Sequence, residues 1–185
     1  MIASVHVDRM GKPLRRCYAT LRGAMARAYV GLGANLGERE PTIRRALELL
    51  GGVPGVEVTR VSTLRETDPW GPVPQPRYLN GVAELETSLD PETLVGALIE
   101  VERRLGRVRG DERWGPRTID LDLLLHGDAE SDVPDLTLPH PRLHERVFVL
   151  EPLAELAPDA LVPGRGTVAD LLRAVTEEAG DTLPP

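Results

Sequence analysis

Stretches with the apolar spacing of strands and of helices follow one another in a fixed order, and this order limits the folds open to the chain. Alternating or short apolar runs are typical of strands, whereas apolar residues three or four positions apart mark one face of a helix. The predicted order is strand, helix, strand, strand, helix, strand, over Ala28–Ala34, Glu40–Leu50, Val56–Val61, Leu79–Glu86, a helix from Asp90 to near Gly106, and Thr118–Leu125. This order predicts an α+β, ferredoxin-like βαββαβ fold, with helices on one face of an antiparallel sheet.

The remaining segments are predicted as loops and C-terminal helices. Residues 67–77 contain four prolines and a glycine and are predicted as a loop, as are residues 126–139. A short helix near Pro141–Glu145, apolar segments to Leu156 and a helix over Thr167–Glu178 are predicted to follow as C-terminal helical additions.

The length of 185 residues suits one domain. We predict a single domain over residues 27–185 and an N-terminal extension over residues 1–26, which is either disordered or the product of an upstream start, because Met25 directly precedes the first strand. The extension is basic and lacks the apolar stretch of a signal peptide.

Composition excludes several classes of function. A formal net charge of −7 argues against a general nucleic-acid binder, and the apolar runs are too short to span a bilayer. The single cysteine, Cys17, excludes an internal disulfide and a cysteine-based zinc cluster and is compatible with a reducing compartment. We therefore expect a cytoplasmic monomer that acts on small molecules and has no nucleic-acid or membrane partner.

The strongest local signal is a pair of aspartates, Asp120 and Asp122, in the last predicted strand. Positions i and i+2 of a strand share a face, so the two carboxylates project together with Cα atoms roughly 6.5–7 Å apart. Like charges side by side repel, and two divalent cations both remove that repulsion and suit phosphoryl transfer. The alternative is a half-buried strand with a solvated polar face.

Arginines precede the aspartates in a loop bounded by glycines. Arg107, Arg109, Arg113 and Arg117 lie within about a dozen residues. Surface arginines ordinarily make weak ion pairs with solvent-exposed acids. Next to a predicted metal site, however, guanidinium groups suit a polyphosphate, because the metals neutralise some oxygens and the arginines bind the others.

Two more groups of residues are candidates for binding. Tyr78 and Asn80 share a strand face, and an aromatic ring with a nearby amide suits a flat heterocycle; otherwise Tyr78 is a core residue and Asn80 completes a turn. His140, followed by Arg146 and Phe148, contacts phosphate only if the fold brings it to the aspartates.

These residues together resemble the 6-hydroxymethyl-7,8-dihydropterin pyrophosphokinase family of folate biosynthesis, over about residues 28–159. The shared blocks are Gly33–Gly37, Glu66-Thr67, Gln75-Pro76, Tyr78–Asn80, Arg107, Arg113–Asp122, Pro139–Pro141 and Glu145–Leu150. The resemblance implies transfer of pyrophosphate from ATP to the hydroxymethyl group of the pterin, release of AMP, and no protein nucleophile.

The resemblance also implies a role for individual residues. Asp120 and Asp122 would bind two Mg²⁺ ions, and with Arg107 and Arg117 they form the predicted catalytic set. The residues predicted to bind ATP are Glu102, Arg107, Arg109, Arg117, Leu123, Leu136, Thr137, His140 and Arg146. The residues predicted to bind the pterin are Gly33, Thr67, Trp70, Tyr78, Asn80, Trp114 and Phe148.

The sequence departs from the family pattern at several positions. Ala34, Asp68, Trp70 and Asp135 stand where other residues are frequent. The alternative to an active enzyme is a non-catalytic nucleotide- or pterin-binding relative, against which the presence of both arginines and both aspartates argues. An RNA-binding module on the same plan would need strand aromatics and positive charge, which this chain lacks.

Overall fold

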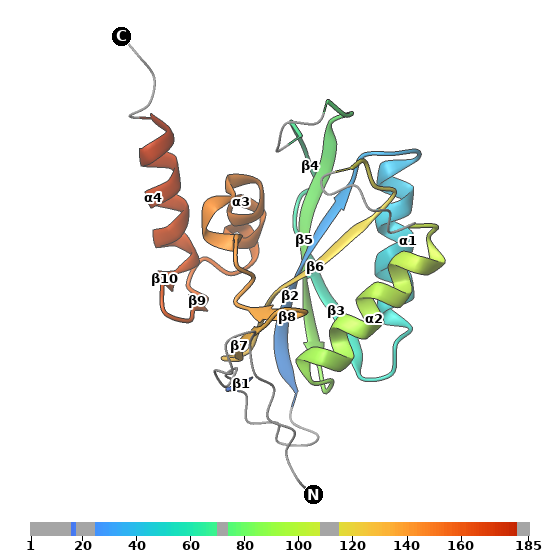
Figure 1. Cartoon of the computed structure of the whole chain (residues 1–185), viewed down its shortest axis with the longest axis horizontal. Coiled ribbons are helices and arrows are strands. Elements are labelled where there is room, and N and C mark those ends of the chain that lie inside the picture. The colour runs from blue at the N-terminus through green and yellow to red at the C-terminus, as the bar shows by residue number, and fades with distance from the viewer. Residues whose placement is uncertain (1–15, 18–24, 70–73, 108–114, 181–185) are drawn as a thin grey trace, which may run out of the picture.

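A five-stranded antiparallel sheet forms the centre of the computed structural model, which describes residues 16–17, 25–69, 74–107 and 115–180 (Figure 1). The strand order is β3-β5-β2-β6, and β4 pairs with the part of β5 that β3 leaves free. The elements up to the end of the sheet are β2 (Ala26–Ala34), α1 (Arg39–Gly51), β3 (Val56–Val61), β4 (Arg65–Thr67), β5 (Tyr78–Thr87), α2 (Pro91–Arg104) and β6 (Asp120–His126). The ferredoxin-like prediction is confirmed.

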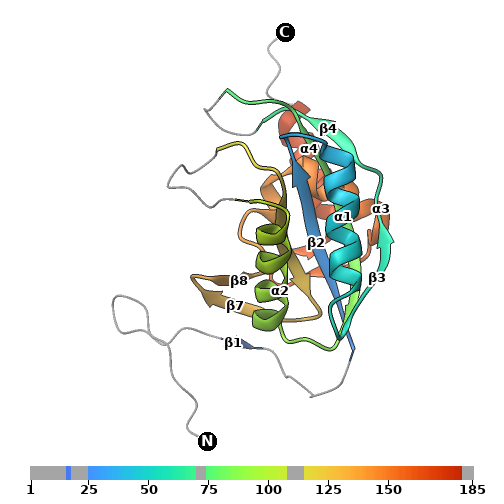
Figure 2. The same ribbon diagram turned by 90° about the vertical axis from the view of Figure 1, so that its right-hand side faces the viewer.

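Helices α1 and α2 lie side by side on one face of the sheet (Figure 2). Their apolar faces, which include Ile43, Leu50, Leu94 and Leu98, pack with alternate residues of the strands in a buried core. Helix α2 begins as predicted: the Asp90 carboxylate accepts a hydrogen bond from the Thr93 backbone N–H at 2.9 Å, and Pro91 is the first helical residue.

The C-terminal additions cover the other face of the sheet. They are η1 (Leu143–Glu145), α3 (Val147–Leu156), β9 (Leu161–Val162), β10 (Gly166–Thr167) and α4 (Val168–Gly180). A second buried core joins α3 and α4 to Tyr29, Val82 and Leu124 of the sheet. Figure 1 shows the sheet edge-on between the two helical layers.

The prediction of a loop over residues 126–139 is wrong. This segment contains β7 (Glu130–Val133) and β8 (Leu136–Leu138), which pair with each other. Ser131, Val133, Leu136 and Leu138 are buried, but β7 has only four residues and β8 three, at or below the shortest runs from which a strand is normally recognised. Thr67, also predicted as loop, is the last residue of β4.

Part of the predicted N-terminal extension belongs to this small sheet. Arg16 and Cys17 form β1, which pairs with Ser131 and Glu130 of β7 in antiparallel register.

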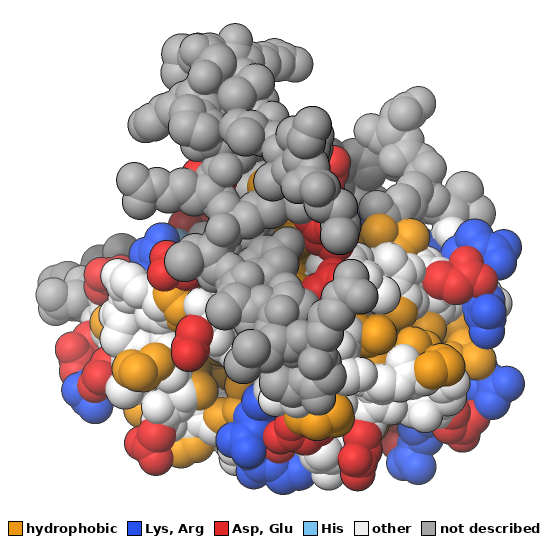
Figure 3. All heavy atoms as spheres, turned by 90° about the horizontal axis from the view of Figure 1, so that it is seen from below, with side chains coloured by type: hydrophobic (Ala, Val, Ile, Leu, Met, Phe, Trp, Pro, Cys, Tyr) orange, Lys and Arg blue, Asp and Glu red, His pale blue; other side chains and the backbone are white. Residues whose placement is uncertain are grey.

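The surface is mixed in charge. Acidic and basic side chains of the described residues are interspersed on the face seen from below in Figure 3. Among the described residues, none of the helices combines the length and apolar character needed to cross a bilayer.

Candidate functional site

Glycines in the central strand make room for a cavity on the α3 face of the sheet. Gly31 and Gly33 of β2 lie opposite Asp122 and Asp120 of β6, respectively. A Cβ atom at position 33 would lie 2.9 Å from Oδ1 of Asn80, closer than real Cβ contacts allow. The absence of a side chain here leaves space directly above the strand, between Asn80 and the two carboxylates.

Asp120 is held by two arginines. Arg107 Nη1 lies 2.6 Å from Oδ1 of Asp120, and Arg117 Nη1 donates a hydrogen bond of 2.6 Å to Oδ2. Burial alone would lower the pKa of Arg117, but the charge of Asp120 and the hydrogen bond to it, together with the charges of Tyr78 and Asp122, raise that pKa overall. Each guanidinium group is thus placed beside a carboxylate that an anionic ligand would have to replace.

Glu102 anchors Arg107 from behind. The Glu102 side chain is buried, and its carboxylate accepts hydrogen bonds from Arg107 Nη1 and from the backbone N–H of Leu121, at 2.8 Å for the latter. Since Leu121 lies between the two aspartates, Glu102 fixes Arg107 relative to β6.

Asp122 is the acid of the site whose pKa is shifted most. Its side chain is 44% accessible, and it lines two cavities. Desolvation, together with repulsion from Asp120, raises the pKa of Asp122 to about 6. Repulsion between two neighbouring carboxylates is what a bound cation relieves, so the pair suits a metal ion.

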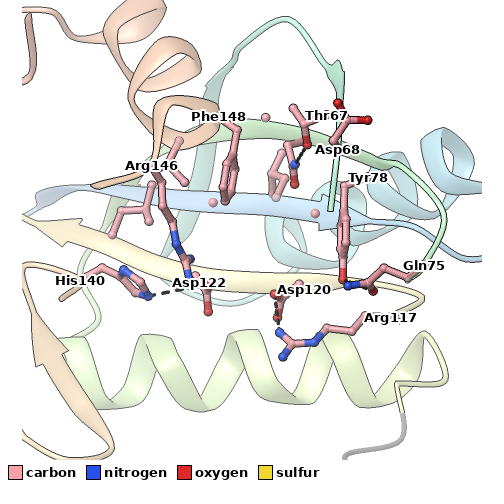
Figure 4. Close-up of a pocket in the computed structure, with 17 residues that line it drawn as sticks. Thr67, Asp68, Gln75, Tyr78, Arg117, Asp120, Asp122, His140, Arg146 and Phe148 are labelled. Carbon is pink, nitrogen blue, oxygen red and sulfur yellow. Dashed lines mark hydrogen bonds and ion pairs between the residues drawn. The ribbon is translucent and has the colours of Figure 1, made fainter. Parts of the chain in front are cut away.

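His140 and Arg146 lie on the other side of Asp122 (Figure 4). His140 Nε2 is 4.0 Å from Oδ2 of Asp122. Burial and the charge of Arg146 lower the pKa of His140 to about 4, so the imidazole is neutral at neutral pH. Burial also lowers the pKa of Arg146, whose guanidinium carbon lies 5.6 Å from the centroid of the Phe148 ring. The fold therefore does bring His140 to the aspartates.

An aromatic ring stands on either side of the cavity. Figure 4 shows Tyr78 at the start of β5 and Phe148 in the first turn of α3, with β2 running beneath them. Between them, Asn80 donates a 2.6 Å hydrogen bond from Nδ2 to the Thr67 hydroxyl, which fixes the orientation of the amide. Two rings and an oriented amide can enclose a flat polar heterocycle.

Asn35 ties three segments of the site together from outside the cavity. Its side chain is buried, and its Oδ1 accepts a 2.7 Å hydrogen bond from the Arg117 backbone N–H. Its Nδ2 donates to Gln75 Oε1 at 3.0 Å and to the Pro76 carbonyl at 3.2 Å. Gln75 Oε1 also accepts from the Tyr78 hydroxyl at 3.1 Å. The position of the aromatic wall is thereby linked to that of Arg117.

Two adjoining cavities meet at Asp122 and His140, which line both. The first, here the aromatic cavity, contains Tyr78, Asn80, Arg117, Asp120, Arg146 and Phe148 among its lining residues. The second, here the edge cavity, lies between α2, β6 and β8 and contains Val95, Leu98, Leu123, Leu136 and Thr137. Two ligands in these cavities would meet beside the carboxylate of Asp122.

Most of the predicted site residues that the structure describes line one of the two cavities. Gly33, Thr67, Tyr78, Asn80 and Phe148, predicted for the pterin, line the aromatic cavity, as do Arg117, Asp120 and Arg146. Leu123, Leu136, Thr137 and His140, predicted for ATP, line the edge cavity. Glu102 and Arg107 line neither cavity and reach the site through Asp120 and Leu121. Trp70, Arg109 and Trp114 lie outside the described residues.

Sequence reasoning did not assign some residues that the structure places at the site. Asp68 and Gln75 line the aromatic cavity, and Asp135 and Ile99 line the edge cavity. The Gln75-Pro76 block pointed to the first of these segments, whereas no short motif marks Ile99, which belongs to the ordinary helical pattern of α2.

The described residues fit a cation that keeps ligands from a substrate. They contain no group of three or more His, Cys, Asp and Glu side chains arranged to hold a metal ion. Mg²⁺ commonly takes only one or two protein carboxylates and completes its shell with phosphate oxygens and water. Asp120 and Asp122, next to each other on one strand face, match that requirement.

Comparison with known proteins places this chain in a family. Residues 29–158 match the profile of the 7,8-dihydro-6-hydroxymethylpterin-pyrophosphokinase (HPPK) family. A Pseudomonas aeruginosa protein named 2-amino-4-hydroxy-6-hydroxymethyldihydropteridine pyrophosphokinase is 47% identical over 158 residues, which cover 85% of this chain and 97% of the relative. A Bacillus subtilis protein of the same name is 47% identical over 129 residues, covering 70% of this chain and 77% of the relative.

A solved structure shares the fold. The HPPK-DHPS protein of Plasmodium falciparum matches with a TM-score of 0.69 at 13% identity, over 88% of this chain. This chain spans 43% of that longer protein, so the likeness concerns the fold of one part of it. With the profile covering more than half of the chain and relatives at 47% identity, the chain belongs to the HPPK family.

Proposed function

We propose that this chain transfers the pyrophosphoryl group of ATP to the hydroxymethyl group of 6-hydroxymethyl-7,8-dihydropterin and releases AMP, as a step in folate biosynthesis. The observation that carries the proposal is the meeting of the aromatic cavity and the edge cavity at Asp122 and His140. Two substrates held in separate cavities must be in contact where the transfer occurs, and here that point is beside two carboxylates and two arginines.

The aromatic cavity is assigned to the pterin. Tyr78 and Phe148 enclose the ring, and the Asn80 amide, oriented by Thr67, pairs with its polar edge. The edge cavity is assigned to the adenosine of ATP, with apolar contacts from Leu98, Leu123 and Leu136. In this arrangement the phosphates of ATP point toward Asp122, and the hydroxymethyl group of the pterin points toward those phosphates.

Asp120 and Asp122 are assigned to two Mg²⁺ ions. When bound, these ions neutralise phosphate oxygens and favour ionisation of the attacking hydroxyl. Burial and, after it, repulsion from Asp120 raise the pKa of Asp122, and such ions would remove the repulsion.

The chain itself contributes charge and position rather than a nucleophile. Arg107 and Arg117, paired with Asp120 in the ligand-free state, exchange that carboxylate for phosphate oxygens when ATP arrives. Glu102 keeps Arg107 anchored during the exchange. Neutral His140 presents a ring N–H to phosphate without adding charge. Together these groups hold the hydroxyl oxygen in line with the β-phosphorus as AMP leaves.

The described residues of a single chain supply both cavities, the two aspartates and two arginines of the proposed site. We therefore also propose that a monomer is active. The single cysteine fits a reducing compartment and supports a cytoplasmic location.

The direct test is AMP release from ATP with Mg²⁺, in the presence and absence of 6-hydroxymethyl-7,8-dihydropterin. We expect AMP only when the pterin is present, and none after addition of a chelator. ATP and pterin binding without AMP would instead identify a non-catalytic relative. Absence of pterin binding would reject the assignment of the aromatic cavity.

A further inference from the structure

The hairpin of β4 and β5 forms one wall of the aromatic cavity, and its backbone pairing stops early. Thr67 and Asp68 on one arm and Gln75 and Tyr78 on the other line the cavity. The strand ladder ends at the pair Thr67 and Tyr78. Beyond it, Pro69, Pro74 and Pro76 have no N–H group to extend the ladder. The spacing of the two arms at the hairpin mouth therefore depends on side chains.

Arg39, the first residue of α1, bonds to both arms. Its Nη2 donates to Oε1 of Glu66 on β4 at 2.5 Å, and its Nη1 donates to the carbonyl oxygen of Arg77, just before β5, at 3.0 Å. One planar guanidinium thus bridges the two sides of the hairpin mouth, a geometry that a single-point cation does not reproduce.

Arg77 adds a second cationic link between the arms. Its Nε lies 3.0 Å from Oδ1 of Asp68 and its Nη1 lies 3.4 Å from Oε2 of Glu66. Arg39, Glu66, Arg77 and Asp68 form a chain of alternating charge, here called the hairpin clasp. Asp68 is at once a clasp residue and a lining residue of the aromatic cavity.

The position of Arg39 is unfavourable for its own helix. The N-terminus of a helix carries partial positive charge, and a cation there costs stability. The preceding residue, Glu38, makes no side-chain capping bond that would offset it. The favourable interactions of the Arg39 guanidinium are with the hairpin, not with α1.

We infer that Arg39 is a positioning residue for the pterin, which acts by holding the two arms of the β4–β5 hairpin at the spacing that the aromatic cavity requires. Arg39 lines neither cavity, so it acts on the substrate only through its contacts with the hairpin. The inference rests on the proposed function of that cavity. Because the clasp is ionic and partly exposed, added salt weakens it, and affinity for an uncharged pterin falls with it.

The test is the dissociation constant of 6-hydroxymethyl-7,8-dihydropterin, measured by fluorescence with Mg²⁺ and saturating α,β-methylene-ATP, at low and high NaCl. For Arg39→Gln we expect a rise of about fivefold at low salt, equivalent to about 1 kcal/mol. The wild-type value should rise with salt toward that of the variant, whose own value should rise less, because only the ion pairs of Arg77 with Glu66 and Asp68 remain in it. In turnover, KM for the pterin should rise more than kcat falls, and Tm should not decrease.

Arg44→Gln is the matched control. It removes the exposed Arg44–Glu40 ion pair of the same helix, neither member of which belongs to the hairpin clasp, and should leave the pterin affinity and its salt dependence as in the wild type. An unchanged pterin affinity in Arg39→Gln with a lowered Tm would show a purely stabilising ion pair and overturn the inference. A wild-type protein that binds no pterin would overturn the proposed function as well.

Discussion

At the scale of single residues, the site depends on where a side chain is missing as much as on where one is present. Gly33 leaves room for Asn80 in the orientation that Thr67 fixes. Asp122, by contrast, is a side chain whose charge the ligand-free fold disfavours. A glycine in a strand and a carboxylate that is partly desolvated both lower the stability of the protein. Both residues line the cavity above β2.

Gly33→Ala should impair pterin binding without unfolding the protein. The added Cβ lies 2.9 Å from Oδ1 of Asn80, so the amide must turn away and lose its bond to Thr67. We expect KM for the pterin to rise about tenfold, in line with a lost hydrogen bond. Gly96→Ala is the control, because a Cβ there meets nothing within 4 Å. Equal KM values for the two variants would contradict this account.

Asp122→Asn should abolish turnover yet stabilise the ligand-free protein. The folded state keeps a proton on Asp122 up to about pH 6, whereas the unfolded chain releases it near 3.8. The wild type therefore loses stability as pH rises through this window.

The gain in unfolding free energy for Asp122→Asn near neutral pH should be at most about 1 kcal/mol, since solvent reaches part of the side chain. It should vanish below about pH 4. Thermal unfolding from acid to neutral pH, without Mg²⁺ or ATP, measures it. A variant less stable than the wild type at neutral pH would show that the carboxylate is stabilising.

At the scale of elements, the turn after β2 connects parts of the site that no strand pairing joins. The Asn35 side chain forms hydrogen bonds with Arg117, which precedes β6 in the sequence, and with Gln75, which precedes β5. The β4–β5 hairpin is thus held from one side by Asn35 and from the other by Arg39. Both connections are made by side chains at the ends of elements, where they restrict displacements of the adjoining loops.

Asn35→Asp should uncouple the hairpin from Arg117. The new carboxylate still accepts from the Arg117 N–H but cannot donate to Gln75 or to the Pro76 carbonyl. We expect a loss of about 1–3 kcal/mol in unfolding free energy, measured by urea denaturation, and a higher KM for the pterin. Gln75→Glu keeps an acceptor for Asn35 and Tyr78 and should cost less. The reverse order of the two losses would reject this role for Asn35.

At the scale of the whole molecule, the sheet separates two helical layers that have different roles. The α1–α2 layer completes a mainly apolar core and lines the edge cavity through α2, whereas the α3 layer shares its face of the sheet with the aromatic cavity. The small sheet of β1, β7 and β8 lies at the edge, where β8 lines the edge cavity and β1 adds two residues.

Removal of residues 1–24 should change stability and turnover little. In the described part of this segment, Arg16 and Cys17 pair with Ser131 and Glu130 of β7 at the edge of the molecule. We expect a change in unfolding free energy below about 1 kcal/mol, typical of a few edge contacts, and an unchanged kcat. Calorimetry and the AMP assay on the shortened chain measure both. A large loss would mean that the N-terminal segment packs on the domain.

Much of this fold could be predicted from sequence because its long elements have clear apolar periods. The helix that starts at Asp90 and the strand Val56–Val61 were predicted almost to the residue. The short strands β7 and β8 were missed, since three or four residues give too little periodicity and their pairing is tertiary.

The candidate site was predictable only where chemistry is concentrated in a short motif. Asp120 and Asp122 are neighbours in sequence, so their shared strand face follows from the alternation of a strand. The clasp contact between Arg39 and Glu66 joins residues 27 positions apart, and an exposed charged side chain has no sequence signal that specifies its partner.

The α1 layer has a consequence for how this protein can change over evolutionary time or in a design programme. Its buried residues Ile43, Ala46 and Leu50 line neither cavity, and the helix reaches the site only through Arg39. Repacking of this helix can therefore raise or lower thermal tolerance while catalysis stays nearly constant. Libraries aimed at robustness belong in the α1 core, and libraries aimed at the choice of pterin belong on the opposite face, where one substitution acts on packing and ligand together.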